Sequence, residues 1–284
     1  SSRLFVQGSL AFTGNLNLYM AQLAAGGTLI AEDVFLPGKW EQVMARERAN
    51  GIYLIPSKLL MLPRVFKSVN ANIRTIISGS QSLGRNDAEV LKKIFPNTEI
   101  TLYYGASELN YITYVKSADM TEERNLIGKP FPGVRVFIQD DEMYVDNAFH
   151  VENITVPYSL RDSGRMDAQG NFYFLGRTDD IVGVRGRKVS MMKIENALEE
   201  VAGITEASVV LLPKEKDADM PAEIVSAFVT VEGTDVPENL RQQLKEKLAD
   251  FEIPKRVIVL EAFPKNTSGK VDKARLRQWW LDSE

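Results

Sequence analysis

Short apolar runs alternate with amphipathic helical stretches through the first third of the chain. Helical patterns lie at residues 16–27, 39–50 and 85–95. The β-rich runs lie at residues 28–31, 51–56, 73–79 and 99–105. This alternation is typical of βα units around a parallel sheet. Because ligands of such sheets bind beyond the carboxyl ends of the strands, the loops SGSQSL and GASE after the last two runs are the expected binding loops.

The pattern changes near Gly133. Residues 133–139, the turn signal Asp140-Asp141 and residues 142–146 predict a hairpin, and further short strands follow to residue 177. This section is expected to be antiparallel. From about residue 180 the chain predicts a helix at 190–203, two strands, a helix at 237–250 and a last strand. We assign Ser190 as the N-cap and Gly203 as the C-cap of the first of these helices.

These patterns predict an α/β fold joined to an α+β fold. Residues 1–178 are expected to form one part, with parallel βα units and a small antiparallel β section. Residues 179–284 are expected to form a compact α+β domain. Near its end, a Gly-containing turn with Lys270 at the start of a helix leads into RQWWL, which is expected to pack back onto this domain. A lysine there opposes the helix dipole, so an anionic ligand is needed to make the position favourable.

Composition excludes several classes of partner and site. The chain has 284 residues with 34 basic and 38 acidic side chains, a net charge of -4, so no polybasic field favours nucleic acid or anionic membrane. Cysteine is absent and His150 is the single histidine, which excludes thiolate and multi-histidine metal sites and a cysteine nucleophile. No apolar run approaches the ~20 residues of a membrane span. We expect a cytoplasmic protein with small-molecule partners.

Three motifs occur in a fixed order along the chain. They are YYGASE at 103–108, YSLRDSGRMDAQGNFYFLGRTDDIVGVRGRK at 158–188, and PKNTSGKVDK at 264–273. In order and spacing this set resembles the adenylate-forming superfamily of acyl-CoA synthetases, firefly-luciferase-like enzymes and peptide-synthetase adenylation domains. The resemblance covers nearly the whole chain. It implies that residues 1–178 are the later part of a larger N-terminal domain and that residues 179–284 form a mobile C-terminal domain. It implies a two-step reaction: a carboxylate attacks the α-phosphate of ATP to give acyl-adenylate and pyrophosphate, and a thiol then displaces AMP.

The resemblance implies roles for residues in both binding loops. Tyr104 matches the aromatic residue that stacks on adenine, and the backbone at Gly105 passes close to the nucleotide. Ser107 matches a position that is usually Thr, whose hydroxyl reaches the phosphate. Glu108 matches the Mg²⁺ ligand, and a carboxylate suits that ion. The adenine-side loop is matched by Gly79, Ser80 and Gln81.

Further nucleotide contacts are implied around the middle motif. Asp162 falls at the position that accepts hydrogen bonds from both ribose hydroxyls, and a carboxylate has the two acceptor oxygens for this. Arg161 stands where the family usually has Gly, so the local backbone is expected to differ. Arg177 matches a ribose-contacting arginine, and Asp179 matches the hinge about which the C-terminal domain rotates between half-reactions.

The resemblance gives Lys270 the catalytic role. It matches the lysine that enters the site during adenylation and bridges the substrate carboxylate and the charge developing at phosphorus, a role that suits a mobile point cation. Gly186 matches the glycine over which a pantetheine arm passes, although Gly183 replaces a frequent lysine nearby. Arg187 and Lys188 either meet coenzyme A phosphates or are solvated surface charges.

One expected feature is missing from the chain. The family has a Ser/Thr/Gly-rich loop ending in Lys that cradles phosphates, upstream of the region matching Ser1, and the chain holds no such loop. The chain also lacks an initiator Met. We interpret it as a fragment whose nucleotide binding and turnover are weak without the missing part.

Three functions therefore stay open. The favoured one is an AMP-forming acyl-CoA ligase that uses ATP, Mg²⁺, a carboxylic acid and coenzyme A. The second is an adenylation enzyme that loads a carrier protein, and the third is a non-catalytic nucleotide- or acyl-binding remnant. A homodimer is left open. The walls of an apolar acyl pocket are expected from FTGN, IYLIPSKLLM, ISGSQ and GASELNY, with Phe12 and Tyr53 among them.

Overall fold

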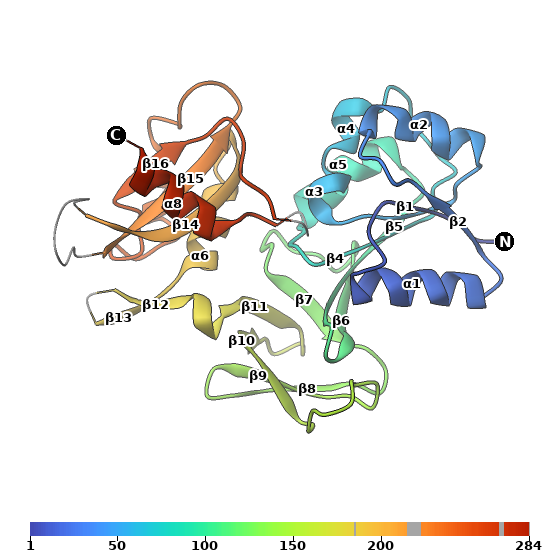
Figure 1. The fold of residues 1–284 in the computed structure, drawn as a ribbon, viewed down its shortest axis with the longest axis horizontal. Coiled ribbons are helices and arrows are strands. Elements are labelled where there is room, and N and C mark those ends of the chain that lie inside the picture. Colours follow the sequence, from blue (N-terminus) through green and yellow to red (C-terminus); the bar gives the residue numbers. More distant parts are fainter. Residues whose placement is uncertain (185, 215–222, 267–269, 284) are drawn as a thin grey trace. The chain divides into compact units, whose positions relative to one another are not determined.

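The computed structural model describes residues 1–184, 186–214, 223–266 and 270–283. The chain divides into two compact units, Ser1–Phe174 and Leu175–Glu284. Figure 1 shows the elements of both.

Unit 1 is built on one eleven-stranded sheet with the order β2-β1-β3-β4-β5-β6-β7-β11-β10-β9-β8. Its strands are β1 (Arg3–Val6), β2 (Thr28–Ala31), β3 (Gly51–Tyr53), β4 (Thr75–Gly79), β5 (Glu99–Ala106), β6 (Asn110–Lys116), β7 (Leu126–Pro130), β8 (Arg135–Gln139), β9 (Glu142–Asp146), β10 (Tyr158–Met166) and β11 (Phe172–Arg177). The first five strands pair in parallel, and the pairings β5–β6, β6–β7, β7–β11, β9–β10 and β8–β9 are antiparallel.

Helices cover both faces of the parallel part of this sheet (Figure 1). They are α1 (Thr13–Ala24), α2 (Pro37–Arg46), α3 (Pro56–Leu59), α4 (Leu62–Val65) and α5 (Arg85–Ile94). The largest core lies under α2 to α5 and includes the fully buried Trp40, Leu59 and Leu62. Leu59 and Leu62 come from the apolar run expected at the acyl pocket, and the structure places them in this core instead. A second cluster lies under α1 and consists largely of tyrosines.

The hairpin predicted at residues 133–146 is present as β8 and β9. Gln139 pairs with Glu142, so the turn has two residues, Asp140 and Asp141, with φ angles of 50° and 65°. Two positive φ angles define a type I′ turn, whose twist matches that of the flanking strands, and Asp tolerates this conformation. The turn signal in the sequence was therefore sufficient to predict this connection.

Unit 2 contains a two-stranded and a three-stranded sheet. Its elements are the 3₁₀ helix η1 (Thr178–Asp180), β12 (Ile181–Val184), β13 (Arg187–Ser190), α6 (Met191–Glu199), β14 (Ile204–Pro213), β15 (Glu223–Val231), α7 (Leu240–Lys245), β16 (Arg256–Val259) and α8 (Lys273–Asp282). β12 pairs with β13, β14 pairs antiparallel with β15, and β15 pairs in parallel with β16.

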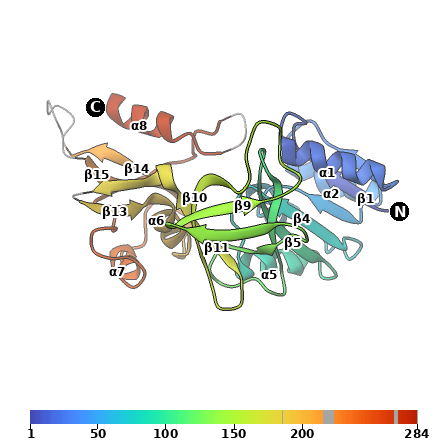
Figure 2. The ribbon, with the colours of Figure 1, turned by 90° about the horizontal axis from the view of Figure 1, so that it is seen from below.

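The alternation of side chains along β14 and β15 gives unit 2 two cores. Val209 and Ala227 face α6 and α7, whereas Leu212 and Phe228 face α8 together with Trp280. Figure 2 shows α8 on one side of the sheet and α6 and α7 on the other. The mixed α/β fold with a smaller C-terminal sheet unit confirms the predicted fold class.

The caps of α6 were only partly predicted. Ser190 is the N-cap, since its hydroxyl oxygen accepts a hydrogen bond from the Lys193 N–H at 3.3 Å. The helix ends at Glu199 with Glu200 as its C-cap, so the assignment of Gly203 was wrong. Gly203 has φ +94° and reverses the chain into β14 after one further turn. A glycine with positive φ marks either position, and sequence alone does not distinguish them.

Gly128 and Gly133 form a matched pair for a stability test. Both have φ near +80°, but a Cβ at Gly128 would lie 2.0 Å from the Tyr114 carbonyl oxygen, whereas one at Gly133 would meet nothing within 4 Å. Gly133→Ala should therefore cost only the strain of a left-handed alanine, about 1–2 kcal/mol, and Gly128→Ala about 2–4 kcal/mol because overpacking is added. Urea unfolding of both variants measures the difference. Equal losses would contradict the close approach of β6 and β7.

Candidate active site

The candidate binding loops lie at one edge of the parallel sheet. Within the sheet β4 and β5 are parallel neighbours, with Gly79 opposite Tyr103, so the loops that follow them start side by side. The ends of β1 and β3 reach the same edge, since Val6 pairs with Tyr53. Both loops thus start at the carboxyl edge of the sheet, the edge at which such folds bind ligands. Their role in binding stays a prediction.

Gly105 is required by the close approach of β6. A Cβ at this position would lie 2.3 Å from the Asn110 carbonyl oxygen, a distance that real side chains do not reach. The register also shifts between Tyr104 and Gly105, which is a bulge in the β5–β6 pairing. Bulges redirect the side chains beside them. This geometry gives Gly105 a structural role, which is compatible with a close backbone approach to a ligand.

Tyr104 and Asp162 lie together although 58 residues separate them. The Tyr104 hydroxyl donates a hydrogen bond to the Asp162 carboxylate, and Asp162 is only 8% exposed. The Tyr104 ring lies 5.9 Å from the Phe174 ring, at 36°. The two residues come from motifs that sequence analysis linked only through the family resemblance. The fold thus places an aromatic ring beside a carboxylate. The ring can stack on a nucleotide base, and the carboxylate can accept hydrogen bonds from the hydroxyl groups of its sugar.

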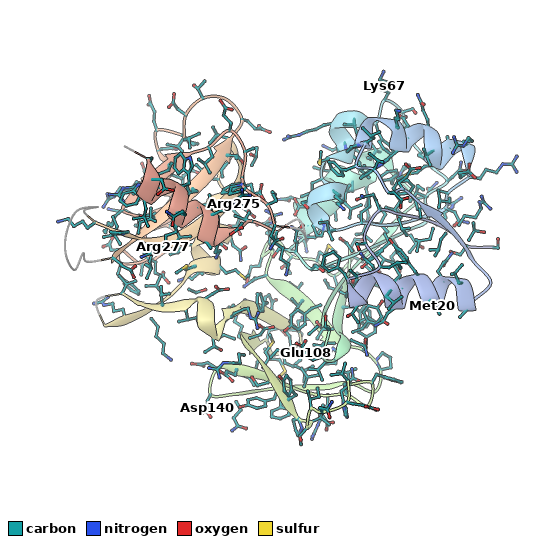
Figure 3. All side chains as sticks on the ribbon, viewed as in Figure 1. Met20, Lys67, Glu108, Asp140, Arg275 and Arg277 are labelled. Atoms are coloured by element: carbon teal, nitrogen blue, oxygen red, sulfur yellow. The ribbon has the colours of Figure 1, made fainter. Side chains whose placement is uncertain are left out.

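Ser107 and Glu108 lie in the tight turn between β5 and β6. Ser107 is exposed and Glu108 half-buried, and Glu108 is labelled in Figure 3. The backbone oxygen of Glu108 accepts a hydrogen bond from the Val151 N–H at 2.9 Å, which holds the turn against the segment after β9. In the part of the chain that the structure describes, no three His, Cys, Asp or Glu side chains cluster as a metal site would need. Among the described residues, Glu108 therefore belongs to no such cluster.

The loop after β4 is shaped by two unusual backbone positions. A Cβ at Gly79 would lie 2.5 Å from the Tyr103 ring, so the ring packs flat against the backbone there. Ser80 has φ +70°, in the left-handed region that glycine favours. The Gln81 side-chain oxygen accepts the Ser57 N–H at 2.9 Å, at the first turn of α3. The Gln81 side chain thus links this loop to α3, a use that sequence analysis did not foresee.

Arg161 adopts a left-handed backbone conformation, which glycine favours. Its φ is +58°, and its N–H donates to the Ser159 hydroxyl oxygen at 3.0 Å. The expectation that the local backbone differs from that of the family, based on the replacement of the family glycine, stays a prediction. An arginine adopts this conformation at a strain of about 1–2 kcal/mol. Asp162, the next residue, is buried.

The candidate residues at the start of unit 2 lie around η1 and the β12–β13 hairpin. Arg177 is the N-cap of η1, and Asp179 lies within that 3₁₀ turn. Gly186 has φ +79°, and a Cβ there would meet nothing within 4 Å, so the glycine meets a conformational requirement of the turn. The Arg187 guanidinium lies 4.7 Å from the centre of the Phe251 ring. The Arg187 side chain therefore has a cation–π partner within unit 2.

Lys270 is exposed and precedes the helix. Its backbone N–H donates to the Asn266 side-chain oxygen at 3.0 Å, and its backbone oxygen accepts the Asn266 N–H at 2.8 Å. The helix α8 starts at Lys273 with Asp272 as its N-cap. The expectation that Lys270 occupies the start of the helix was wrong, because the Asp272 side chain already caps that terminus. Residues 267–269 lie outside the described residues.

Ion pairs fix the chain on both sides of Lys270. Before it, Lys265 binds Glu206 at 2.5 Å, and after it, Lys273 binds Glu195 at 2.9 Å. Burial raises the pKa of the Glu195 carboxyl, against the lowering effect of Lys273. Glu195 also accepts the Val209 N–H at 2.7 Å, so it links α6, β14 and α8. Lys270 is therefore exposed, although ion pairs attach the chain to unit 2 both before and after it.

Two further residues, Lys58 and Asn266, lie near the candidate site residues although no motif in the sequence indicated them. Lys58 is half-buried at the carboxyl edge, where its ammonium donates to the Gln7 carbonyl oxygen at 3.2 Å and to the Gln7 side chain, and burial lowers its pKa. Its signal was a lysine within the apolar run IYLIPSKLLM. The signal for Asn266 was its place four residues before Lys270, but side-chain to backbone bonds of this kind are common in loops.

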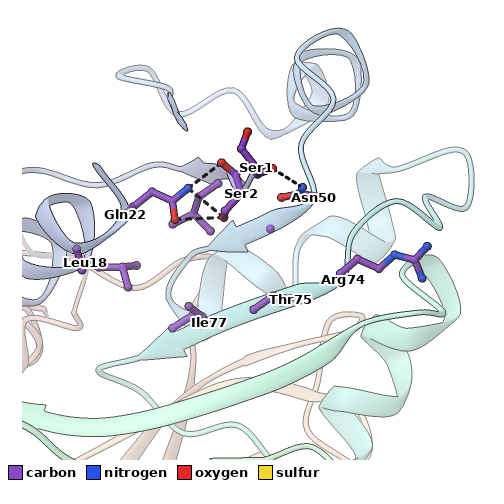
Figure 4. A pocket seen from close by; sticks show the side chains of 11 residues that line it. Ser1, Ser2, Leu18, Gln22, Asn50, Arg74, Thr75 and Ile77 are labelled. Carbon is purple, nitrogen blue, oxygen red and sulfur yellow. Dashed lines mark hydrogen bonds between the residues drawn. The ribbon is translucent and has the colours of Figure 1, made fainter. Parts of the chain in front are cut away.

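A separate pocket lies at the opposite, amino edge of the sheet (Figure 4). It has a volume of about 450 Å³ and lies beside the starts of β1, β3 and β4, among Leu4, Leu18, Gln22, Asn50 and Thr75. The Gln22 side chain donates to the Ser2 carbonyl oxygen at 3.1 Å across it. Because the sequence motifs lie at the carboxyl edge, this pocket belongs to a different part of the fold.

Comparison with known proteins identifies the family. The family model of AMP-binding enzymes matches residues 1–148, more than half of the chain, and the model of the AMP-binding enzyme C-terminal domain matches residues 193–270. The chain therefore belongs to the AMP-binding enzyme family. Of the described helices, none is long and apolar enough to cross a membrane.

Individual relatives agree with this assignment. The chain is 25% identical to an uncharacterized acyl-CoA ligase, YhfT, of Bacillus subtilis, over 99% of this chain and 61% of that protein. It is 26% identical to a linear gramicidin synthase protein of Brevibacillus parabrevis, over 97% of this chain and 6% of that protein. The fold matches O-succinylbenzoate coenzyme A synthetase (MenE) of Bacillus subtilis, solved with ATP and magnesium ion, with a TM-score of 0.81, 19% identity and coverage of 99% and 62%. The chain thus spans about three fifths of the length of YhfT and MenE.

The Tyr104–Asp162 contact can be tested by stability. Tyr104→Phe removes the donor and leaves a buried carboxylate with one hydrogen bond fewer, so unfolding should become easier by about 1–3 kcal/mol. Tyr144, which stacks on Phe137 with ring centres 5.7 Å apart, provides the control. Tyr144→Phe should cost less than about 0.5 kcal/mol. Denaturant unfolding of both variants is the measurement, and a loss at Tyr104 no larger than the control would contradict the contact.

Proposed function

We propose that this protein activates a carboxylic acid with ATP and transfers the acyl group to a thiol, with coenzyme A as the favoured acceptor. In the first step a carboxylate oxygen forms a bond to the α-phosphorus of ATP, and the bond from that phosphorus to the pyrophosphate breaks. In the second step the thiol sulfur attacks the acyl carbon, AMP leaves, and the thiol proton is released. The products are an acyl thioester, AMP and pyrophosphate.

The observation that supports this proposal most directly is the contact between Tyr104 and Asp162. It joins two of the three family motifs at the carboxyl edge of the sheet, beside the turn with Ser107 and Glu108. In the proposal, the Tyr104 ring stacks on adenine, Asp162 and Arg177 hold the ribose, and the Ser107 hydroxyl reaches phosphate. The backbone of the loop at Gly79, Ser80 and Gln81 borders the base.

Glu108 fits a magnesium ion bound jointly with the nucleotide. It is a half-buried carboxylate beside the phosphate-reaching Ser107, and Mg²⁺ commonly uses few protein carboxylates together with phosphate oxygens. When bound, the ion would neutralise phosphate charge. This assignment needs no further ligand from the described residues.

Lys270 supplies the movable positive charge in this proposal. Its ammonium group is exposed on unit 2, and it would stabilise the charge that develops on the phosphorus oxygens as the carboxylate attacks. We divide the chain functionally into residues 1–178 and 179–284, with Asp179 as the hinge that brings either Lys270 or the Gly186 loop to the nucleotide. The 3₁₀ turn at Thr178–Asp180 is a short element that can absorb such a rotation.

Lys270→Ala tests the division of labour between the two steps. Loss of one stabilising charge should lower acyl-adenylate formation by about 10²–10³-fold, followed by ATP–pyrophosphate exchange. Thioester formation from a supplied acyl-adenylate should change by less than about threefold, because the lysine is not needed for the thiol attack.

Lys247→Ala is the control for Lys270→Ala. It removes an exposed lysine of unit 2 that is paired with Glu200 and does not anchor the chain beside Lys270, so it should leave both steps near the wild-type rates. An equal fall of both half-reactions in the Lys270 variant would contradict the role proposed for this residue.

A carrier-protein thiol is the second candidate acceptor. The observation that favours it is the match of nearly the whole chain to a linear gramicidin synthase protein. Acyl transfer to free coenzyme A and to a phosphopantetheinylated carrier protein, measured side by side, separates the two. We expect at least about tenfold faster transfer to coenzyme A, and a faster transfer to the carrier would reverse the assignment.

ATP binding without ATP–pyrophosphate exchange for any acid would favour the non-catalytic alternative.

A further inference from the structure

The acyl-pocket walls expected from the sequence enclose a group of tyrosine rings. Tyr53 ends β3 and Tyr103 lies on β5, and both are almost fully buried, at 5% and 8% exposure. Their hydroxyl groups share a hydrogen bond of 2.8 Å, and their rings stack with centres 6.5 Å apart. The Tyr111 ring lies edge-on to Tyr103, with centres 4.9 Å apart. These rings occupy the space between α1 and the sheet.

The wall segments pack directly on these rings. A Cβ at Gly14, in the first turn of α1, would lie 3.0 Å from the Tyr103 hydroxyl oxygen and 3.6 Å from that of Tyr53. On the other side, a Cβ at Gly79 would lie 2.5 Å from the Tyr103 ring. The Tyr103 side chain therefore occupies the space between Gly79 and Gly14. A larger residue at either glycine would come too close to it.

The position of Tyr103 follows from the alternation of side chains along β5. Tyr104 and Tyr103 are neighbours and point to opposite faces of the sheet. Tyr104 contacts Asp162 on the proposed nucleotide side, and Tyr103 contacts Gly14 on the side of α1. A carboxylate presented at the Gly105 end of β5 thus has the nucleotide site on one face and the Tyr103 ring close behind it on the other.

We propose that the acid activated by this protein is a short-chain carboxylic acid of a few carbon atoms, and that Tyr103 is the residue that limits its length. This inference rests on the proposed function. A longer chain would have to displace a ring that is packed against two backbone segments and hydrogen bonded to a second buried ring. Dense interiors resist such displacement. Burial raises the pKa of both hydroxyl groups of this tyrosine pair.

The test is the acyl-length profile of the protein and of Tyr103→Ala. ATP–pyrophosphate exchange is measured with a series of straight-chain acids from acetate to decanoate. The wild-type protein should prefer the shortest acids, with a fall of about tenfold or more for each methylene beyond the limit. Tyr103→Ala should move that limit outward by several carbon atoms and raise exchange with octanoate by at least about a hundredfold relative to acetate.

Two further variants separate ring volume from other effects. Tyr103→Phe keeps the ring and removes only the hydroxyl, so the length limit should stay. Tyr19→Ala removes a ring that is equally buried in the same cluster, 6.4 Å from the Tyr53 ring and bonded to Gly8. It should lower stability without moving the limit. If Tyr103→Ala does not fold, as judged by circular dichroism, Tyr103→Leu replaces it and should give a smaller outward shift.

The possible results distinguish this inference from the function on which it rests. Wild-type exchange that is fastest with octanoate or decanoate would overturn the inference and leave the proposed function intact. An unchanged limit in folded Tyr103→Ala would also overturn it. No exchange with any acid, in a folded protein that includes the phosphate-binding loop expected from the family, would overturn the proposed function and the substrate assignment together. A short-acid profile that widens only in the Tyr103→Ala or Tyr103→Leu variants supports both.

Discussion

The pairing of β5 with its two neighbours is the constraint on which the candidate site depends. On one side β4 runs parallel to β5, and on the other β6 runs antiparallel and approaches so closely that only glycine fits at position 105. The end of β5 is thereby fixed between two strands. Every residue proposed to contact the nucleotide or the acid in unit 1 is placed relative to that end.

One strand can serve two ligands because a strand presents its side chains alternately to two faces. Tyr104 faces the antiparallel section, where Asp162 is buried and accepts its hydrogen bond. Tyr103 faces α1 and belongs to a separate hydrophobic cluster. The candidate site thus lies where the parallel and antiparallel parts of the sheet meet. The parallel part provides the surroundings of Tyr103, and the antiparallel part provides Asp162.

Unit 2 contributes a different kind of group. Lys270 is exposed, and the ion pairs of Lys265 and Lys273 hold its loop to the body of the unit. The role proposed for Lys270 requires a charged group that is available and yet not buried in its own domain, because burial of an unpaired cation is costly. The anchored loop with an exposed ammonium group meets both requirements.

The sequence by itself determined the order of elements, the fold class and the loops that hold the candidate residues. Periodicity and turn signals depend on local interactions, so the βα units, the Asp140-Asp141 turn and the Ser190 cap could be predicted. The end of α6 and the position of Lys270 relative to α8 could not, because several nearby residues can end or cap a helix. Only the tertiary structure showed that Tyr104 meets Asp162, that Gln81 binds α3 and that Tyr103 packs between the segments expected to form the walls of an acyl pocket. These contacts join residues distant in the chain, and the hydrophobic pattern states only which residues are buried, not which ones meet.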